Sequence, residues 1–197
     1  MNTSQSELVL DAQDVAIHYG GVKAVDGVAL SLYRGQIHGL IGPNGAGKST
    51  VIDAITGRVR LTRGKVLLGG VDVTGLGPTE RRQRGLSRSF QRTSIFSQMM
   101  VRQQVELASY KTGVADSGAD ADAILAELDL MHLTHAEAAD LGYGEQRRLD
   151  LALALVGRPT VLLLDEPMAG LSVKESHDLS THLKSLTSRW DVSVLLV

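Results

Sequence analysis

A glycine-rich segment between an apolar run and a helical pattern constrains the fold of this chain more than any other feature. Residues 42–50 read GPNGAGKST, which fits the pattern G-x-x-x-x-G-K-[ST] without a gap. The run before it, QIHGLI at 36–41, is short and mostly apolar, as in a strand that is buried on both faces. The segment after it, VIDAITG, predicts a helix that ends at Gly57. Strand, glycine loop and helix in this order predict a phosphate-binding loop.

The residue types of this loop suit the binding of a nucleoside triphosphate. Glycines let consecutive backbone N–H groups converge on an anion, and the helix that follows adds its positive dipole end. Lys48 supplies a mobile charge for the β- and γ-phosphates, and the hydroxyl of Ser49 can ligate Mg²⁺. A nucleoside triphosphate and Mg²⁺ are therefore the expected ligands of this loop. The expected nucleotide-binding residues of the loop are Gly42, Pro43, Asn44, Gly45, Ala46, Gly47, Lys48, Ser49 and Thr50.

A second motif, VLLLDE at 161–166, is the expected companion of this loop. An apolar strand places Asp165 at its carboxyl end, where the ligands of open parallel sheets bind. We expect Asp165 to hold Mg²⁺ through a water molecule, and Glu166 to act as the general base that polarises the attacking water. The two motifs together predict a P-loop nucleoside triphosphatase.

The rest of the chain predicts an α/β domain, because strands alternate with helices after the glycine loop. Strands are predicted near 15–19, 28–32, 65–68, 160–165 and 192–197, and helices near 121–130, 145–156 and 173–188. The polar stretch 93–139 interrupts the parallel sheet, and we expect it to form a small helical lobe with a surface loop at 112–120. The arginine-rich stretch 78–92 is predicted as a solvated helix and loop.

Composition and charge argue against several other classes of protein. The formal net charge is -2, so the chain lacks the dense positive charge that binds a phosphate backbone, and no nucleic-acid partner is expected. Cysteine is absent, which rules out disulfides and thiolate metal sites. His132 and His135 have no evident third ligand and are expected to be surface histidines. No apolar run approaches the ~20 residues of a membrane span, so a role at a membrane would need partners that cross it.

The segment LGYGEQRR at 141–148 lies one helix before the Asp165–Glu166 strand. It indicates which class of P-loop nucleoside triphosphatase the chain resembles. Here the chain resembles the ATPase subunits of ABC transporters, whose signature is usually written LSGGQ. The resemblance covers nearly the whole chain, with the motifs in the same order. It implies that this segment presents its glycine backbone and a helix N-terminus to the γ-phosphate of ATP bound to a second subunit. The signature residues are Leu141, Gly142, Tyr143, Gly144 and Glu145.

Three other segments resemble the same family. The resemblance implies that Gln91 contacts Mg²⁺ and the attacking water, that Tyr19 stacks on adenine, and that residues 169–172 meet their twin across a dimer. The implied fold is a P-loop core with a mainly parallel sheet, an N-terminal antiparallel β subdomain and a small helical subdomain. Within a single domain over 1–197, we expect the β subdomain and the first part of the core at 1–92, the helical subdomain at 93–140, and the signature helix with the rest of the core at 141–197.

The family also implies partners and a place in the cell. These are a second ABC ATPase subunit, in a homo- or heterodimer, and transmembrane permease subunits, which would hold the chain as a peripheral protein on the cytoplasmic side of the cell membrane. Tyr143 and the run GEQRRLDLALAL after it resemble the ATPases of branched-chain amino acid importers. The expected function is ATP hydrolysis that powers import of branched-chain or other hydrophobic amino acids. Importers of urea or amides share much of the pattern and remain an alternative.

Two departures from the family pattern bear on activity. Gly142 stands where most of the family has Ser, which removes one donor to the γ-phosphate at a cost of about 1 kcal/mol. The chain ends at Val197, shortly before the place where the family has a switch-loop histidine, and none of its histidines matches that residue. We therefore expect this chain to bind ATP but to hydrolyse it slowly.

Three rival readings fit the sequence less well. A DNA-repair ATPase of this type would carry a very long coiled coil between Ser49 and Leu141, where this chain has a short interval without sustained heptads. A P-loop kinase or GTPase would lack the segment LGYGEQ. A regulatory module that only binds ATP stays open, because the switch histidine is missing.

Overall fold

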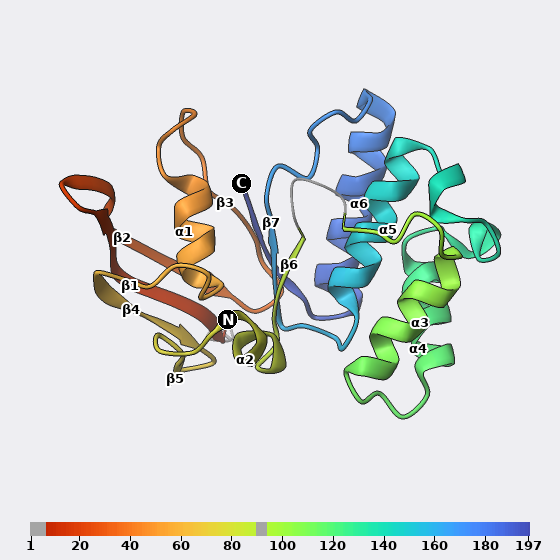
Figure 1. Cartoon of the computed structure of the whole chain (residues 1–197), viewed down its shortest axis with the longest axis horizontal. Helices are drawn as coiled ribbons and strands as arrows, with labels where there is room; N and C mark the ends of the chain where they lie inside the picture. The colour runs from red at the N-terminus through yellow and green to blue at the C-terminus, as the bar shows by residue number, and fades with distance from the viewer. Residues whose placement is uncertain (1–6, 90–93) are drawn as a thin grey trace, which may run out of the picture.

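The computed structural model describes residues 7–89 and 94–197, which form two sheets with helices beside them (Figure 1). One sheet is antiparallel with the strand order β2-β1-β4-β5, and the other is parallel with the order β3-β8-β7-β6. The strands of the antiparallel sheet are β1 (Leu8–Tyr19), β2 (Val22–Tyr33), β4 (Arg63–Leu68) and β5 (Val71–Asp72). Those of the parallel sheet are β3 (Ile37–Gly39), β6 (Leu86–Ser89), β7 (Val161–Leu164) and β8 (Ser193–Leu196). The predicted α/β fold with a parallel sheet is confirmed.

The parallel sheet has an apolar core on each of its faces. All four residues of β7 are buried, as expected for a central strand of a parallel sheet. Leu162 and Leu164 pack into one core, whereas Val161 and Leu163 pack into the other, because successive side chains of a strand point to opposite faces. The second core is shared with the antiparallel sheet and with α1 (Lys48–Ile55), so the sheets are held together by apolar contacts.

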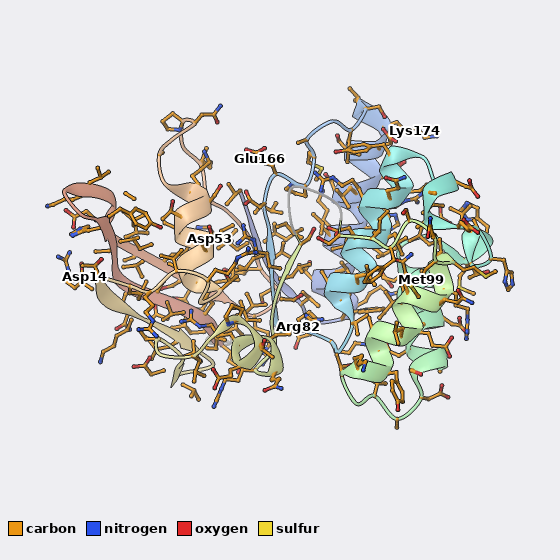
Figure 2. The ribbon with its side chains drawn as sticks, viewed as in Figure 1. Asp14, Asp53, Arg82, Met99, Glu166 and Lys174 are labelled. Carbon is orange, nitrogen blue, oxygen red and sulfur yellow. The ribbon has the colours of Figure 1, made fainter. Side chains whose placement is uncertain are left out.

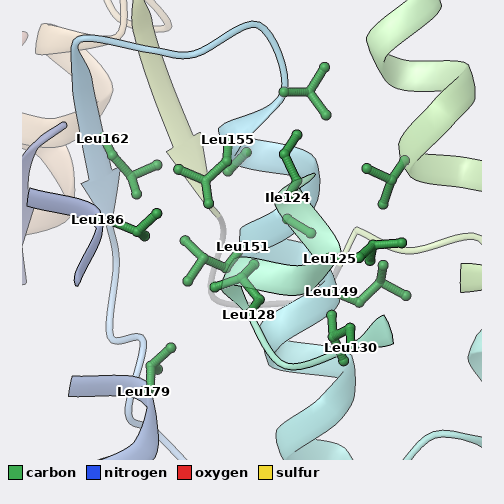
Figure 3. Packing of buried hydrophobic residues seen from close by; sticks show 14 of the residues in the cluster. Ile124, Leu125, Leu128, Leu130, Leu149, Leu151, Leu155, Leu162, Leu179 and Leu186 are labelled. Atoms are coloured by element: carbon green, nitrogen blue, oxygen red, sulfur yellow. The ribbon is translucent and has the colours of Figure 1, made fainter. Parts of the chain in front are cut away.

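The first core joins the parallel sheet to the helices of the other half of the molecule (Figure 3). Three leucines of α5 (Tyr143–Leu155) lie between the parallel sheet and a second group of leucines in this core. Those of α5 are Leu149, Leu151 and Leu155, and those of the second group are Leu125, Leu128 and Leu130. The helices in this half are α3 (Val101–Lys111), α4 (Ser117–Glu127), α5 (Tyr143–Leu155) and α6 (Val173–Arg189), with two short 3₁₀ turns at η1 (Met131–Leu133) and η2 (Ala138–Asp140). The helices predicted near 121–130, 145–156 and 173–188 are present as α4, α5 and α6, with ends that differ by a few residues.

Two local predictions were wrong. The run 36–41 was expected to form a strand buried on both faces, but β3 is exposed along its length, because among the described strands it pairs with β8 alone and lies at the edge of the sheet. The loop expected at 112–120 is shorter, since α4 begins at Ser117. Asp116 caps this helix by accepting a hydrogen bond from the backbone N–H of Ala119 at 2.9 Å.

Within residues 7–89 and 94–197, no helix combines the length and the apolar character that crossing a bilayer requires.

Candidate nucleotide site

The predicted phosphate loop leads directly into α1 at one edge of the parallel sheet (Figure 1). Gly47 is the N-cap of the helix and has φ 84°, a left-handed conformation that favours glycine. A β-carbon at this position would stand 2.6 Å from the backbone oxygen of Ala24 in β2. Gly47 is therefore required both by its own backbone angle and by close packing on the antiparallel sheet.

Lys48 folds back over its own loop. Its Nζ donates hydrogen bonds to the backbone oxygens of Gly42 at 2.9 Å and Pro43 at 3.0 Å. The first turn of α1 contains no acidic residue, so no fixed negative charge there would compete with a bound anion. The loop thus combines a mobile ammonium group with a helix N-terminus, which suits a phosphate group.

Asp165 and Glu166 follow the carboxyl end of β7. Asp165 is 3% exposed, and its Oδ2 accepts a hydrogen bond from Nη2 of Arg88 at 3.0 Å. Among the described residues, no hydrogen-bond partner reaches its other oxygen, Oδ1, which is also buried. An ionised carboxylate oxygen without a partner is costly to bury, so this atom fits a bound cation or a water molecule held by one.

Glu166 is exposed and has φ 48°, in the left-handed region where a residue other than glycine is strained. Its backbone N–H donates to the oxygen of Val197 at 3.0 Å, which continues the pairing between β7 and β8. Figure 2 shows Glu166 at the upper edge of the sheet, on the side where the phosphate loop enters α1. The structure therefore places the phosphate loop and the Asp165–Glu166 pair at the same end of the parallel sheet.

Three further residues predicted near the nucleotide differ in how far the structure describes them. Tyr19 is the last residue of β1, and its side chain is 54% exposed at the turn between β1 and β2. Gln91, predicted to contact Mg²⁺ and the attacking water, lies outside the described residues. Ser49 is the second residue of α1 and exposed, so its hydroxyl oxygen is accessible at the phosphate loop.

The predicted signature segment forms the start of α5, and Gly142 is the N-cap of this helix. The Oε2 of Glu145 accepts a hydrogen bond from the backbone N–H of Gly142 at 2.8 Å, and glycine has no side chain that could return a bond to the backbone of Glu145. Leu141 is buried in the core beside it. Gly144 lies against Glu175 of α6, because a β-carbon on this glycine would stand 2.3 Å from Oε1 of Glu175.

Tyr143 connects the signature segment to the loop at residues 169–172. Its hydroxyl donates to the backbone oxygen of Ala169 at 3.1 Å, and a β-carbon on Gly170 would stand 3.1 Å from its ring. The guanidinium of Arg147 lies 5.7 Å from the centre of the same ring. The sequence predicted each of these two segments, but their direct contact was not foreseen.

The prediction of a solvated basic stretch at 78–92 was wrong for three of its arginines. Arg81 is fully buried in α2 (Pro78–Gln83), where it donates to four backbone oxygens, those of Ala54, Ile55, Thr74 and Leu76. Arg82 donates to two backbone oxygens at the end of α5, and Arg88 bridges Asp53 and Asp165. Arg81 and Arg82 thus satisfy carbonyl groups, including those that the ends of α1 and α5 leave without partners, whereas Arg88 bonds two carboxylates.

Comparisons with known proteins agree with this geometry. A family model described as ABC transporter matches residues 25–169. Two relatives are 34% identical to the chain, in alignments that cover 98% of it and 82% of each relative. They are the high-affinity branched-chain amino acid transport ATP-binding proteins BraF of Pseudomonas aeruginosa and LivG of Escherichia coli K12.

Solved structures show the same fold. The ADP conformation of an ATP-binding cassette of an ABC transporter matches with a TM-score of 0.88 and 29% identity, over 96% of this chain and 80% of that chain. A second structure, cbiO1 from Clostridium perfringens, matches with a TM-score of 0.89 over 96% of this chain and 78% of its own. At 24% identity, this second match supports the fold alone.

Proposed function

The chain belongs to the ABC transporter family, and from this premise we propose that it binds and hydrolyses ATP to power such a transporter. One observation carries the proposal. The phosphate loop at the start of α1 and the Asp165–Glu166 pair after β7 lie at the same edge of the parallel sheet. A glycine loop that binds phosphates, beside a carboxylate pair at the carboxyl ends of the strands, is the arrangement that phosphoryl transfer to water requires.

In this proposal the loop holds the phosphates of ATP. Backbone N–H groups of residues 42–50 donate to the phosphate oxygens, and Lys48 exchanges its two carbonyl acceptors for the β- and γ-phosphates. Tyr19 at the end of β1 stacks on the adenine. Mg²⁺, when bound, neutralises charge on the β- and γ-phosphates, and the oxygens of Ser49, Asp165 and Gln91 are the groups proposed to hold it.

Glu166 is the proposed general base. Its carboxylate is exposed at the edge of the sheet, so it can reach a water molecule beside the γ-phosphate and accept its proton as the oxygen attacks phosphorus. The left-handed backbone at Glu166 is consistent with a residue whose position is fixed by its function. Gln91 is proposed to orient the same water.

Removal of the ammonium group of Lys48 tests the site. In the Lys48→Ala variant, affinity for ATP with Mg²⁺, measured by calorimetry, should fall roughly tenfold or more, since a charge-assisted contact to phosphate contributes about 1.5–3 kcal/mol. Lys65→Ala is the matched control, because Lys65 is exposed on β4 in the other sheet. Equal affinities in the wild type and Lys48→Ala would refute the site assignment.

The signature residues Leu141, Gly142, Tyr143, Gly144 and Glu145 are proposed to act on the ATP of a second subunit. In a head-to-tail dimer, Gly144 of one copy would face Lys48 of the other. The exposed ring of Tyr143 and the helix N-terminus beside it support this assignment. With Glu166→Gln in place to block turnover, ATP should convert the monomer to a dimer in light scattering. A variant that also carries Lys48→Ala should stay monomeric, whereas a Glu166→Gln protein that stays monomeric with ATP would contradict the arrangement.

The substrate class follows from the relatives, whose names specify high-affinity branched-chain amino acid transport. We propose import of branched-chain or other hydrophobic amino acids, with transmembrane permease subunits as partners and the chain bound on the cytoplasmic side of the membrane. Residues 1–92, 93–140 and 141–197 are the proposed divisions of its domain. Uptake of labelled leucine, but not urea, by proteoliposomes that hold the chain with its copurifying membrane proteins would support this assignment, and the reverse preference would overturn it.

A further inference from the structure

We propose that Arg88 is a positioning residue for Asp165, which it aims at the metal ion while it ties Asp165 to the phosphate-loop helix. The inference rests on the proposed nucleotide site and adds to it a residue that the sequence motifs do not include. The basic stretch at 78–92 predicts a solvated Arg88, whereas the structure buries this side chain beside Asp165.

Arg88 lies on β6 beside Leu163 of β7, and its side chain is only 10% exposed. Its Nη2 donates to Oδ2 of Asp165 at 3.0 Å. Its Nη1 donates to Oδ1 of Asp53, which lies on α1, the helix that begins at Lys48. One guanidinium group therefore joins the end of β7 to the helix that carries the phosphate loop.

The hydrogen bond from Arg88 occupies one carboxylate oxygen of Asp165 and does not involve the other. Because Arg88 holds Oδ2, rotation of the carboxylate is restricted, and the direction of Oδ1 is set by the protein. Oδ1 is buried and has no hydrogen-bond partner among the described residues, so it is the oxygen available to a cation or to a water molecule that the cation holds. Arg88 thus fixes the carboxylate without competing for that oxygen.

The two contacts of residue 88 require arginine rather than lysine. A guanidinium group presents several N–H donors in a rigid plane and can bond two carboxylates at once, whereas an ammonium group is a single point on a flexible chain. Arg88 uses two of its nitrogens for Asp53 and Asp165, which come from different elements. A lysine at this position would keep the charge but bond one carboxylate well.

The effect of Mg²⁺ on nucleotide affinity separates this role from a general structural one. The dissociation constant of a non-hydrolysable ATP analogue is measured in Mg²⁺ and in EDTA, and their ratio gives the metal enhancement. Arg88→Met should lower the enhancement roughly tenfold, as expected for a residue that orients a metal ligand. Arg88→Lys should lower it less, and affinity in EDTA should change little. Arg63→Met is the control, because Arg63 forms an exposed pair with Asp14 in the antiparallel sheet.

A double variant identifies the residue through which Arg88 acts. If Arg88 works by aiming Asp165, then Asp165→Asn with Arg88→Met should lose no more metal enhancement than Asp165→Asn alone. Additive losses would overturn the proposal, as would an unchanged enhancement in Arg88→Met. Should Arg88→Met not fold, as judged by thermal unfolding, an unchanged enhancement in Arg88→Lys would overturn it. A wild-type chain that binds the analogue in neither condition would instead refute the nucleotide site itself.

Discussion

The carboxylate of Glu175 lies where a side chain on Gly144 would have to stand. The β-carbon position of Gly144 is 2.3 Å from Oε1 of Glu175, and the other oxygen, Oε2, accepts hydrogen bonds from the backbone N–H and the hydroxyl of Ser172 at 2.8 and 2.6 Å. Glu175 therefore caps α6 while it packs against the start of α5. Glu175 thus couples the signature segment to the loop before α6, in addition to the contact that Tyr143 makes with this loop.

Replacement of Gly144 should disturb this cap. Gly144→Ala should lower the free energy of unfolding by about 1–3 kcal/mol, because the new methyl group displaces Glu175 from Ser172. In a Glu175→Ala background the same change should be much less destabilising, since the carboxylate is absent. Urea denaturation of the four proteins in this double-mutant cycle measures the coupling, and a coupling energy near zero would show that Glu175 moves aside freely.

Stability should also depend on the charge of Glu175. Hydrogen bonds from Ser172, and a further one from the backbone of Gly144, hold the pKa of Glu175 below its ordinary value of 4.5. A carboxylate with a lowered pKa stabilises the folded state above its unfolded pKa and loses this effect as pH falls through the folded pKa. The stability difference between the wild type and Glu175→Gln should be full above about pH 4.5 and shrink below it. Urea denaturation across this range checks the trend, and a difference independent of pH would contradict it.

The two loop glycines with left-handed backbones should differ in their tolerance of a side chain. Gly45 has φ 80° and no atom within 4 Å of its β-carbon position, so Gly45→Ala should destabilise by about 1–2 kcal/mol from backbone strain alone. Gly47 has φ 84° and also meets the backbone oxygen of Ala24 at 2.6 Å, which cannot move without distortion of β2. Gly47→Ala should therefore be clearly more destabilising in thermal unfolding. Equal losses of thermal stability in the two variants would show that the contact of residue 47 with β2 adds nothing to the requirement for glycine.

Arg81 should contribute far more to the free energy of unfolding than a solvated arginine does. Arg81→Met would remove a donor from the backbone oxygens of Ala54, Ile55, Thr74 and Leu76, of which that of Ala54 keeps a hydrogen bond from the N–H of Gly57; each buried oxygen left unsatisfied costs about 1–3 kcal/mol. We expect a loss of at least about 3 kcal/mol in urea denaturation. Arg84→Met is the matched control, because Arg84 is exposed just after the same helix, and its effect should stay within about 0.5 kcal/mol. Similar losses in both variants would refute the structural role of Arg81.

Local sequence patterns predicted most of the elements that build the candidate site. The phosphate loop, α1, β7 and α5 occur close to where the patterns placed them, because glycine requirements, strand hydrophobicity and helix caps act over a few neighbouring residues. The run 36–41 was misjudged for the opposite reason. An apolar pattern predicts a strand, but whether the strand is buried depends on which other strands lie beside it.

Local patterns were enough to predict the family, the order of the elements, and the places of Lys48 and Asp165 at the ends of a helix and a strand. The bonds of Arg88 to Asp53 and Asp165, the burial of Arg81 among carbonyl groups, and the contact of Glu175 with Gly144 depend on how the elements pack. Each of these contacts joins residues on separate elements. From sequence alone, a charged residue is predicted to be solvated. It is buried only where the fold brings opposite charges or unsatisfied carbonyl oxygens within hydrogen-bond distance of it.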